Sequence, residues 1–264
     1  DADTDVPDDR VSAGLADRQR DLKSLVSFAV GCMFGRYSLD VPGLVLAGQG
    51  GGIREYLERV PEPTFMPDED GILPVTDDEY FEDDIVTLFV GFMSRAYGEG
   101  HLEENLRFVA DSLGGSGSPR QVLRNYFSNR FYADHCATYN LPGTGKRPIY
   151  WMLESGPLGG FRAMFYVHRY TPDLLARVRT DYVHERQERY RSRISELESQ
   201  KKSASKSDAR GIDRELRTTR AQLDETNKFE ERLHHLADQM VELDLNDGVK
   251  SNYARLQSVL ARIR

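Results

Sequence analysis

Residues 149 to 170 read IYWMLESGPLGGFRAMFYVHRY, and they carry the clearest strand signal of the chain. The two ends, IYWMLES and FRAMFYVHRY, are rich in aromatic and branched residues, which favour extended structure. The GPLGG between them supplies glycines and a proline, the residues that tight connections require. This stretch therefore predicts a β-hairpin.

The sequence before this hairpin predicts helices. Apolar residues from Leu22 to Met33 repeat at helical intervals, and residues 53 to 60 form a short helical pattern. The order Thr76-Asp77-Asp78-Glu79 has the form of a capping box, which predicts a helix from there to about Tyr97. Two more helices are expected at 102 to 113 and after Ser118-Pro119, where the proline takes the first helical position. Prolines at 61, 63, 67 and 74 exclude regular structure from residues 61 to 74.

Beyond the hairpin the chain becomes long, charged and almost free of glycine and proline. Residues 172 to 200 and 208 to 243 are separated by the polar stretch KKSASKSDARG, and both keep apolar residues at roughly heptad intervals. Thr219, Thr226 and Glu230 weaken the second seam. We expect an antiparallel, coiled-coil-like helical hairpin, followed by a short helix at 248 to 263 that folds back. The expected seam residues are Leu175, Val183, Tyr190, Ile194, Leu197, Ile212, Leu216, Leu223, Leu233, Leu236, Met240 and Leu243.

These patterns together predict a mainly α fold with a small β-hairpin element, in the α+β class. Residues 1 to 20 open with the acidic tract DADTDVPDDR and are expected to be a disordered or linker tract of a piece cut from a longer chain. Residues 21 to 170 are expected to form a helical body that ends in the β-hairpin. Residues 171 to 264 are expected to form the long helical hairpin and its closing helix.

Composition narrows the classes of function. The 264 residues carry a formal net charge of −8, and residues 1 to 170 hold 16 Lys and Arg against 26 Asp and Glu. A domain-wide basic footprint is absent, so any DNA contact must be local. The longest apolar run, residues 25 to 34, is about half of what a membrane span needs. Cys32 and Cys136 show no metal or disulfide spacing, and we expect a cytoplasmic protein without a membrane partner.

The stretch YNLPGTGKRPIYWM, at 139 to 152, resembles two kinds of active site and matches neither. A phosphate-binding loop needs Gly where Asn140 stands and Ser or Thr where Arg147 stands. The Asn-Pro-Pro-aromatic box of amino-methyltransferases lacks its second proline and its aromatic residue, because Leu141 and Gly143 occupy these places. A surface loop is the better interpretation.

Other motifs are equally incomplete. A calcium loop built on the acidic stretch 68 to 71 would have Met66 at its first ligand position and Asp77 at its last, and two prolines interrupt it, so a solvated acidic loop is the better interpretation. The histidines show no metal spacing. No nucleophile stands in a recognisable context. We therefore assign no catalytic, cofactor-binding or metal-binding residue.

Cations gather around the predicted β-hairpin. They are Lys146, Arg147, Arg162 and Arg169, and Tyr150, Trp151, Phe165 and Tyr166 are interleaved with them. Arginine beside exposed aromatic residues is typical of nucleic-acid contact, which makes the four cations candidates for DNA binding. The alternative is that the alternating hairpin residues simply form the core.

Long strings spread from about residue 20 onward resemble one family. Among them are SFAVGCMFGRYSLDVPGLVLA, NYFSNRFYADHCATY, KRPIYWMLESG, FRAMFYVHRYTPDLLARVRTDYVHE and FEERLHHLADQMVELDLNDGVKSNYARLQ. They closely resemble the C-terminal part of the PglX family, the adenine-specific DNA methyltransferases of type 1 BREX phage-defence systems. KRPIYW belongs to the family pattern, whereas NLPGTG looks like a local insertion.

The resemblance implies a bacterial parent enzyme that uses S-adenosylmethionine to methylate adenine N6 in double-stranded DNA. Its catalytic domain would lie upstream, so no cofactor or catalytic residue is implied for any position here. Two interpretations remain open. The region either helps the enzyme engage DNA and recognise its site, or serves as a scaffold that docks other BREX proteins or a second copy.

Overall fold

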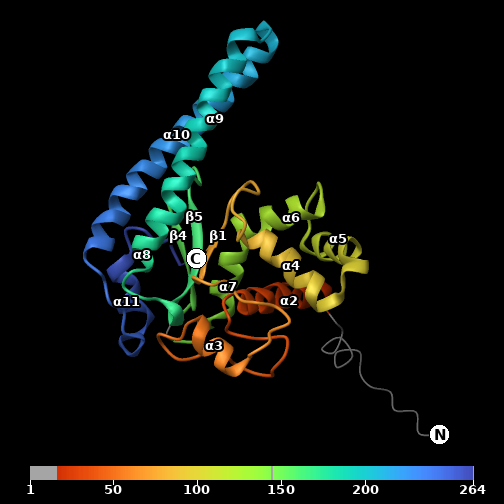
Figure 1. Cartoon of the computed structure of the whole chain (residues 1–264), viewed down its shortest axis with the longest axis vertical. Helices are drawn as coiled ribbons and strands as arrows, with labels where there is room; N and C mark the ends of the chain where they lie inside the picture. The colour runs from red at the N-terminus through yellow and green to blue at the C-terminus, as the bar shows by residue number, and fades with distance from the viewer. Residues whose placement is uncertain (1–16, 144, 264) are drawn as a thin grey trace, which may run out of the picture.

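The structure is a computed structural model that describes residues 17 to 143 and 145 to 263. Helices form most of it, and a small antiparallel sheet lies between two groups of helices (Figure 1). The expected fold class, mainly α with a small β element, is confirmed. No helix in the described part of the chain is both long enough and apolar enough to cross a bilayer.

The sheet contains the predicted hairpin and one strand that the sequence did not predict. β4 (Tyr150–Glu154) and β5 (Arg162–Tyr166) pair antiparallel, so the hairpin prediction is confirmed. β1 (Ile72–Pro74) pairs with the other edge of β5, and the prediction that residues 61 to 74 lack regular structure is wrong there. An edge strand tolerates Pro74 because one side of its backbone needs no ladder donor.

Both faces of this sheet are buried, and alternate residues divide between two hydrophobic clusters. Tyr150 and Met152 on β4 face the cluster that also holds α2, while Trp151 and Leu153 face the cluster that holds α10. This is the period of two that side chains follow along a strand. The hairpin therefore joins two halves of one molecule.

The first cluster is formed by the body helices. The predicted start of one of them is wrong: its helix begins at Ile85, and the carboxylate of Asp84 caps it by accepting from the amides of Val86 and Thr87. Thr76 instead donates its hydroxyl to the carbonyl of Asp78. The body helices are α2 (Arg18–Met33), α3 (Ile53–Arg59), α4 (Ile85–Tyr97), α5 (Leu102–Leu113), α6 (Pro119–Tyr126) and α7 (Tyr132–Thr138), with a π-helical turn at Phe127–Phe131 and a 3-10 turn at Glu99–His101.

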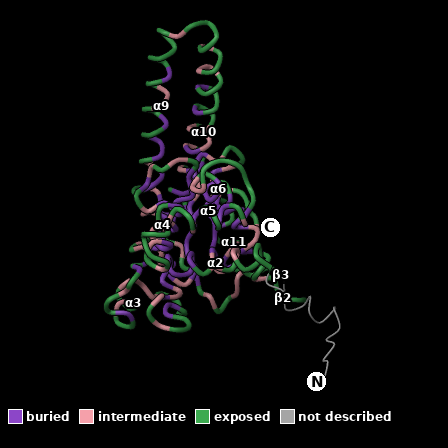
Figure 2. The backbone as a smooth tube through the Cα atoms, turned by 90° about the vertical axis from the view of Figure 1, so that its right-hand side faces the viewer, coloured by how far each residue is buried: buried purple, intermediate pink, exposed green. Residues whose placement is uncertain are grey.

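The second cluster packs against the helical hairpin, which projects as a long arm (Figures 1 and 2). Its antiparallel arrangement is confirmed, although Met240 lies beyond the end of α10 and is 51% exposed instead of lying in the seam. Thr219 and Thr226 are buried in the seam, where each hydroxyl donates to a carbonyl of its own helix. The elements here are the 3-10 turn Val167–Arg169, α8 (Leu174–Arg177), the π-helical turn Val178–Val183, α9 (His184–Ser203), α10 (Lys206–Asp238), the 3-10 turn Leu245–Asp247 and α11 (Gly248–Leu256).

Of the acidic tract expected at residues 1 to 20, residues 1 to 16 lie outside the described residues. Asp17 caps α2 by accepting from the amide of Arg20, so the last residues of that tract belong to a helix.

Candidate nucleic-acid interface

Lys146 and Arg147 lie on a small hairpin at the surface. β2 (Asn140–Leu141) pairs antiparallel with β3 (Gly145–Lys146), and the amide of Arg147 donates to the carbonyl of Tyr139 at 2.8 Å. Asn140, Leu141 and Gly145 thus belong to the strands of a two-stranded hairpin, and the next regular element after it is β4, which is a strand and not a helix. The backbone has neither the strand-to-helix geometry of a phosphate-binding loop nor the sequence of one.

This small hairpin forms one wall of a groove, and α11 forms the other. Figure 2 shows β2 and β3 beside α11, and the groove between them has a volume of about 540 Å³. Lys146 and Arg147 line it together with Lys250, so three cations share the groove. The carboxylate that also lines it, Asp247, forms an ion pair with Arg255 at 3.2 Å. The groove is therefore a local positive site on an acidic protein.

Arg162 is partly buried and lies outside this groove. Its Nε donates to the Glu154 carboxylate at 2.9 Å, across the β4–β5 pair. Opposite charges facing each other on neighbouring strands stabilise the pair. The arginine therefore already has an anionic partner within the protein.

Arg169 is 6% exposed and also lies outside the groove. Its guanidinium donates to the backbone carbonyls of Asp68, at 2.8 Å, and of Glu69, at 2.7 Å. These contacts hold the loop that leads into β1. The structure thus brings together only two of the four cations that the sequence suggested for DNA contact, Lys146 and Arg147.

The aromatic residues between these cations belong to the core. Trp151, Phe165 and Tyr166 are completely buried, and Tyr150 is 2% exposed. Of the two interpretations of the alternating aromatic residues, the core interpretation is confirmed. No aromatic side chain of β4 or β5 is presented to a ligand.

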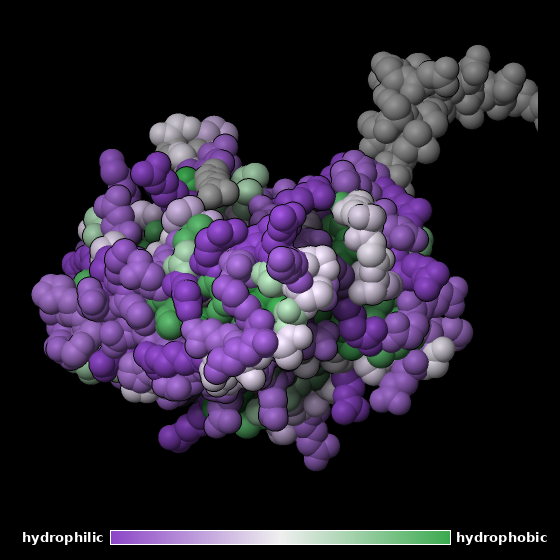
Figure 3. Space-filling model, turned by 90° about the horizontal axis from the view of Figure 1, so that it is seen from above, coloured by the Kyte–Doolittle hydropathy of each residue, from purple (hydrophilic) through white to green (hydrophobic). Residues whose placement is uncertain are grey.

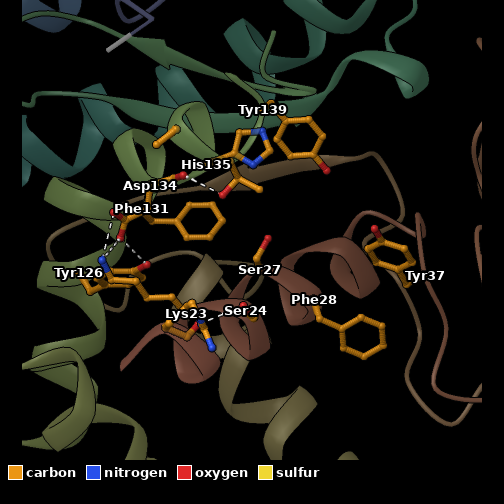
Figure 4. A pocket seen from close by; sticks show the side chains of 13 residues that line it. Lys23, Ser24, Ser27, Phe28, Tyr37, Tyr126, Phe131, Asp134, His135 and Tyr139 are labelled. Atoms are coloured by element: carbon orange, nitrogen blue, oxygen red, sulfur yellow. Dashed lines mark hydrogen bonds and ion pairs between the residues drawn. The ribbon is translucent and has the colours of Figure 1, made fainter. Parts of the chain in front are cut away.

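A second hollow, of about 580 Å³, lies between α2 and α7, and Tyr139, which directly precedes β2, lines it. Its wall is largely aromatic: in Figure 4, Phe28 and Tyr37 lie on one side, Phe131 on the opposite side, and Tyr139 beside His135. We call this hollow the aromatic pocket.

Three charged side chains line the aromatic pocket. Lys23 bonds the Asp134 carboxylate at 3.0 Å, and that carboxylate also accepts from the hydroxyl of Tyr126 at 2.9 Å. Arg20 stands more open, with 71% of its side chain exposed. The lining itself holds two cations and one carboxylate, and Asp21, just outside it, lies 3.7 Å from the guanidinium of Arg20.

His135 is a neutral imidazole in the wall of this pocket. Burial, and to a smaller extent the nearby charge of Arg36, lowers its pKa to about 3. The amide of Tyr150 donates to its Nε2 at 3.1 Å, which places the ring proton on Nδ1. That Nδ1 is buried and has no hydrogen-bond partner among the described residues.

Sequence reasoning did not find Lys250 or the aromatic pocket. Lys250 lies more than a hundred residues after Lys146, and no spacing rule links two positions that only the fold brings together. The pocket side chains were equally hard to find, because aromatic residues at helical spacing are typical of a core. The only usable signal was the isolated Lys146-Arg147 pair.

The chain is similar to two curated proteins. No protein-family model matches the chain. The adenine-specific methyltransferase PglX of Lacticaseibacillus casei (strain Zhang) is 38% identical over 95% of this chain and 20% of its own length. The adenine-specific methyltransferase BrxX of Escherichia coli O9:H4 (strain HS) is 39% identical over 94% of this chain and 21% of its own length. The chain thus spans about a fifth of these curated relatives, and it matches one region of the PglX and BrxX adenine-specific methyltransferases.

Proposed function

We propose that this chain is a non-catalytic, DNA-engaging region of an adenine-N6 DNA methyltransferase of the PglX type. In the parent enzyme it would help to hold the target site during the marking of host DNA and the exclusion of phage in a BREX system. The groove between the small β2–β3 hairpin and α11 carries the proposal, because Lys146, Arg147 and Lys250 share it.

Electrostatics support a contact confined to this groove. The net charge of −8 repels a polyanion, but screening limits that repulsion to about 8 Å at physiological salt. Lys146 and Arg147 are exposed, and no ion pair neutralises either of them within the described residues. A phosphate in the groove would meet both cations and Lys250 together.

We infer that S-adenosylmethionine binds outside this region, and two features of the described residues support this inference. Asn140, the one candidate for an Asn-Pro-Pro-aromatic box, stands on an exposed two-stranded hairpin and is followed by Leu141. The glycine-rich loops that bind such cofactors connect a strand of a parallel sheet to the N-terminus of a helix. The β1–β5–β4 sheet is antiparallel and offers no such connection. We therefore place the cofactor and the methyl transfer elsewhere in the parent enzyme.

Titration of the chain with duplex DNA over a series of salt concentrations tests the proposal. The triple variant Lys146→Ala, Arg147→Ala, Lys250→Ala should bind more weakly, and its log–log salt slope should fall by about 2 to 3, since each phosphate contact contributes about 0.9. The matched control removes three exposed arginines from other helices of the body, Arg54, Arg95 and Arg107. Equal losses of DNA affinity in both variants would show that only the net charge of the protein matters. This result would refute a DNA contact in the groove.

A second function, protein docking, is favoured by the helical arm. The ion pairs of its outer part lie within or between its own two helices, such as Arg193–Glu196 within α9, and Arg193–Glu215 and Lys201–Asp213, both at 2.5 Å, between α9 and α10. The view along the arm shows a mostly hydrophilic surface with small, scattered apolar areas (Figure 3). A partner on this arm would therefore be recognised mainly through polar contacts.

A further inference from the structure

The proposed contact with the DNA backbone leaves the aromatic pocket between α2 and α7 without a role. The pocket is open on one side and has the volume of a small-molecule site, about 580 Å³. The rings of Phe28 and Tyr37 stack with their centroids 5.3 Å apart, and Phe28 is still 36% exposed. The exposed face of Phe28 is therefore free to stack on a ligand.

The charges that line the pocket select the class of ligand. Aromatic walls around a lone carboxylate would suit a cation, but Lys23 already pairs with Asp134 at 3.0 Å. Arg20 adds a second positive charge to the lining, and its ion-pair partner, Asp21, lies 3.7 Å away and outside the lining of the pocket. The lining therefore suits a flat, neutral group attached to an anion.

His135 adds a requirement for a hydrogen-bond acceptor. With Nε2 accepting from Tyr150, the Nδ1–H is a donor that no described group satisfies. The ring of the partly buried Tyr139 lies beside the imidazole, with the two ring centroids 4.8 Å apart, and both residues line the pocket. A flat group with ring nitrogens or carbonyl oxygens would satisfy the Nδ1–H donor.

We infer that the aromatic pocket receives one unstacked nucleobase of a DNA strand, whose phosphate lies near Arg20 and Lys23. This inference rests on the proposed function, because the small hairpin joins the two sites. Tyr139, in the pocket, directly precedes β2, and Arg147, in the groove, directly follows β3. A DNA strand that crosses the small hairpin could therefore place its phosphates in the groove and one of its bases against the aromatic rings of the pocket.

A comparison of two single-stranded oligonucleotides tests the inference: one carries its bases, and the other has the same length with abasic sugars throughout. Base stacking on aromatic residues should make the first bind roughly 5- to 150-fold more tightly. The double variant Phe28→Ala, Tyr139→Ala should remove most of this difference and keep the binding of the abasic strand. Tyr139→Phe, which keeps the ring, should preserve the difference. So should Tyr97→Ala, which removes an equally large ring that is 50% exposed at the end of α4.

Failure of the inference and failure of the proposed function give different results. If both strands bind equally well to the unaltered chain, the pocket takes no base, although the groove still engages the backbone. If neither strand binds while duplex DNA still does, the inference is wrong and the proposed function stands; if duplex DNA does not bind either, both are wrong. If adenosine monophosphate binds in a Phe28-dependent manner while both strands bind alike, the pocket serves a free nucleotide and our assignment is wrong. Thermal unfolding of every variant shows whether a loss reflects the pocket or the fold.

Discussion

At the residue scale, Arg169 shows how an arginine can look like a ligand contact in the sequence and be part of the framework. Its guanidinium lies against Gly71, where an added Cβ would come within 3.1 Å of Cζ, and it donates to the carbonyls of Asp68 and Glu69. Gly71 itself has φ of +73°, which favours glycine there. The arginine therefore fixes the turn that leads into β1.

We expect Arg169→Ala to destabilise the fold without a specific effect on DNA. Each buried carbonyl left without a donor costs about 1 to 3 kcal/mol, so the Tm should fall by several degrees. Arg147→Ala should do the reverse, lowering affinity for DNA and leaving the Tm unchanged, because its side chain is exposed. Thermal unfolding and DNA titration of both variants provide the check. A stable Arg169→Ala variant with weakened DNA binding would restore the interpretation made from sequence.

Asp68 gives the loop before β1 a pH dependence. Burial, together with the nearby carboxylates of Asp70 and Asp83, raises its pKa from 3.8 to about 8. Its Oδ1 accepts from the amides of Gly71 and Ile72. Because the folded state binds the proton more tightly, it holds more protons than the unfolded state between about pH 4 and pH 8. The contribution of Asp68 to stability is present at low pH and is lost as the pH rises through this window.

Asp68→Asn should therefore flatten the dependence of the free energy of unfolding on pH. The amide oxygen can still accept from both backbone amides, and no charge is left to bury. We expect the variant to gain stability relative to the unaltered chain at pH 8 to 9, and to gain little or lose some near pH 4. Urea unfolding at several pH values measures this, and parallel pH profiles for the two proteins would contradict it.

The residue scale is also where the sequence was least informative about function. The pair Lys146-Arg147 could be found because no core pattern explains it. Arg162 and Arg169 have the same side chain, and only the fold distinguishes them, since one faces Glu154 and the other faces backbone carbonyls. A long cationic side chain is buried only where residues far away in the sequence provide partners for it. The local sequence pattern does not predict those partners.

At the scale of elements, the stretch GPLGG does more than reverse the chain. The Glu225 carboxylate of α10 accepts from Ser155 Oγ at 2.7 Å, from the Leu158 amide at 2.8 Å and from the Gly160 amide at 3.0 Å. A Cβ on Gly160 would lie 2.5 Å from Thr226 Oγ1 and 2.7 Å from the Gln222 carbonyl. The glycine therefore permits the close approach of α10, and Glu225 anchors the arm to the sheet.

Glu225→Ala should loosen this anchor. A hydrogen bond to a charged group contributes about 1.5 to 3 kcal/mol, and the variant loses three of them, so we expect at least that loss of unfolding free energy. The neighbouring Asp224→Ala is a matched control. It also removes one carboxylate from α10, but the ion pair of Asp224 with Lys228 is exposed and such pairs contribute little. Chemical unfolding measures the stability of both variants. Equal stabilities would mean that the hydrogen bonds of Glu225 do not stabilise the fold.

Elements differed in how well the sequence predicted them. Periodicity located α2 and α5, and Ser118 caps α6 as its sequence indicates, by accepting from the Gln121 amide. The start of α4 was misplaced because Thr76 and Asp84 are both acceptable caps locally. A long-range contact favours Asp84: Arg124 of α6 donates to its carboxylate at 2.9 Å. β1 was missed for a similar reason, since three residues ending in proline become a strand only when β5 offers them an edge.

At the scale of the whole molecule, the arm and the body are separable in function. Toward the body, Arg186 bonds Asp77 and Asp78, and Tyr190 bonds the carbonyl of Gly160. Farther out, Leu197 and Leu216 are the last fully buried side chains of the seam. The groove and the aromatic pocket are both built by elements of the body and α11, so the outer arm contributes to neither.

This separation allows the two proposed functions to be tested against each other in one experiment. Replacing residues 198 to 215 with a short Gly-Ser turn keeps Leu197 and Leu216 and removes the outer arm. The lost ion pairs, such as Arg220–Glu198, are about half exposed and contribute little, so the body should keep its Tm. Binding of DNA and its salt slope should then be unchanged.

In the parent enzyme we expect methylation to persist, because the arm tip touches neither the groove nor the aromatic pocket. Loss of phage exclusion with methylation retained would assign the arm to protein docking. Loss of DNA binding by the shortened chain would mean that the arm itself holds the duplex, and the groove would no longer explain the function.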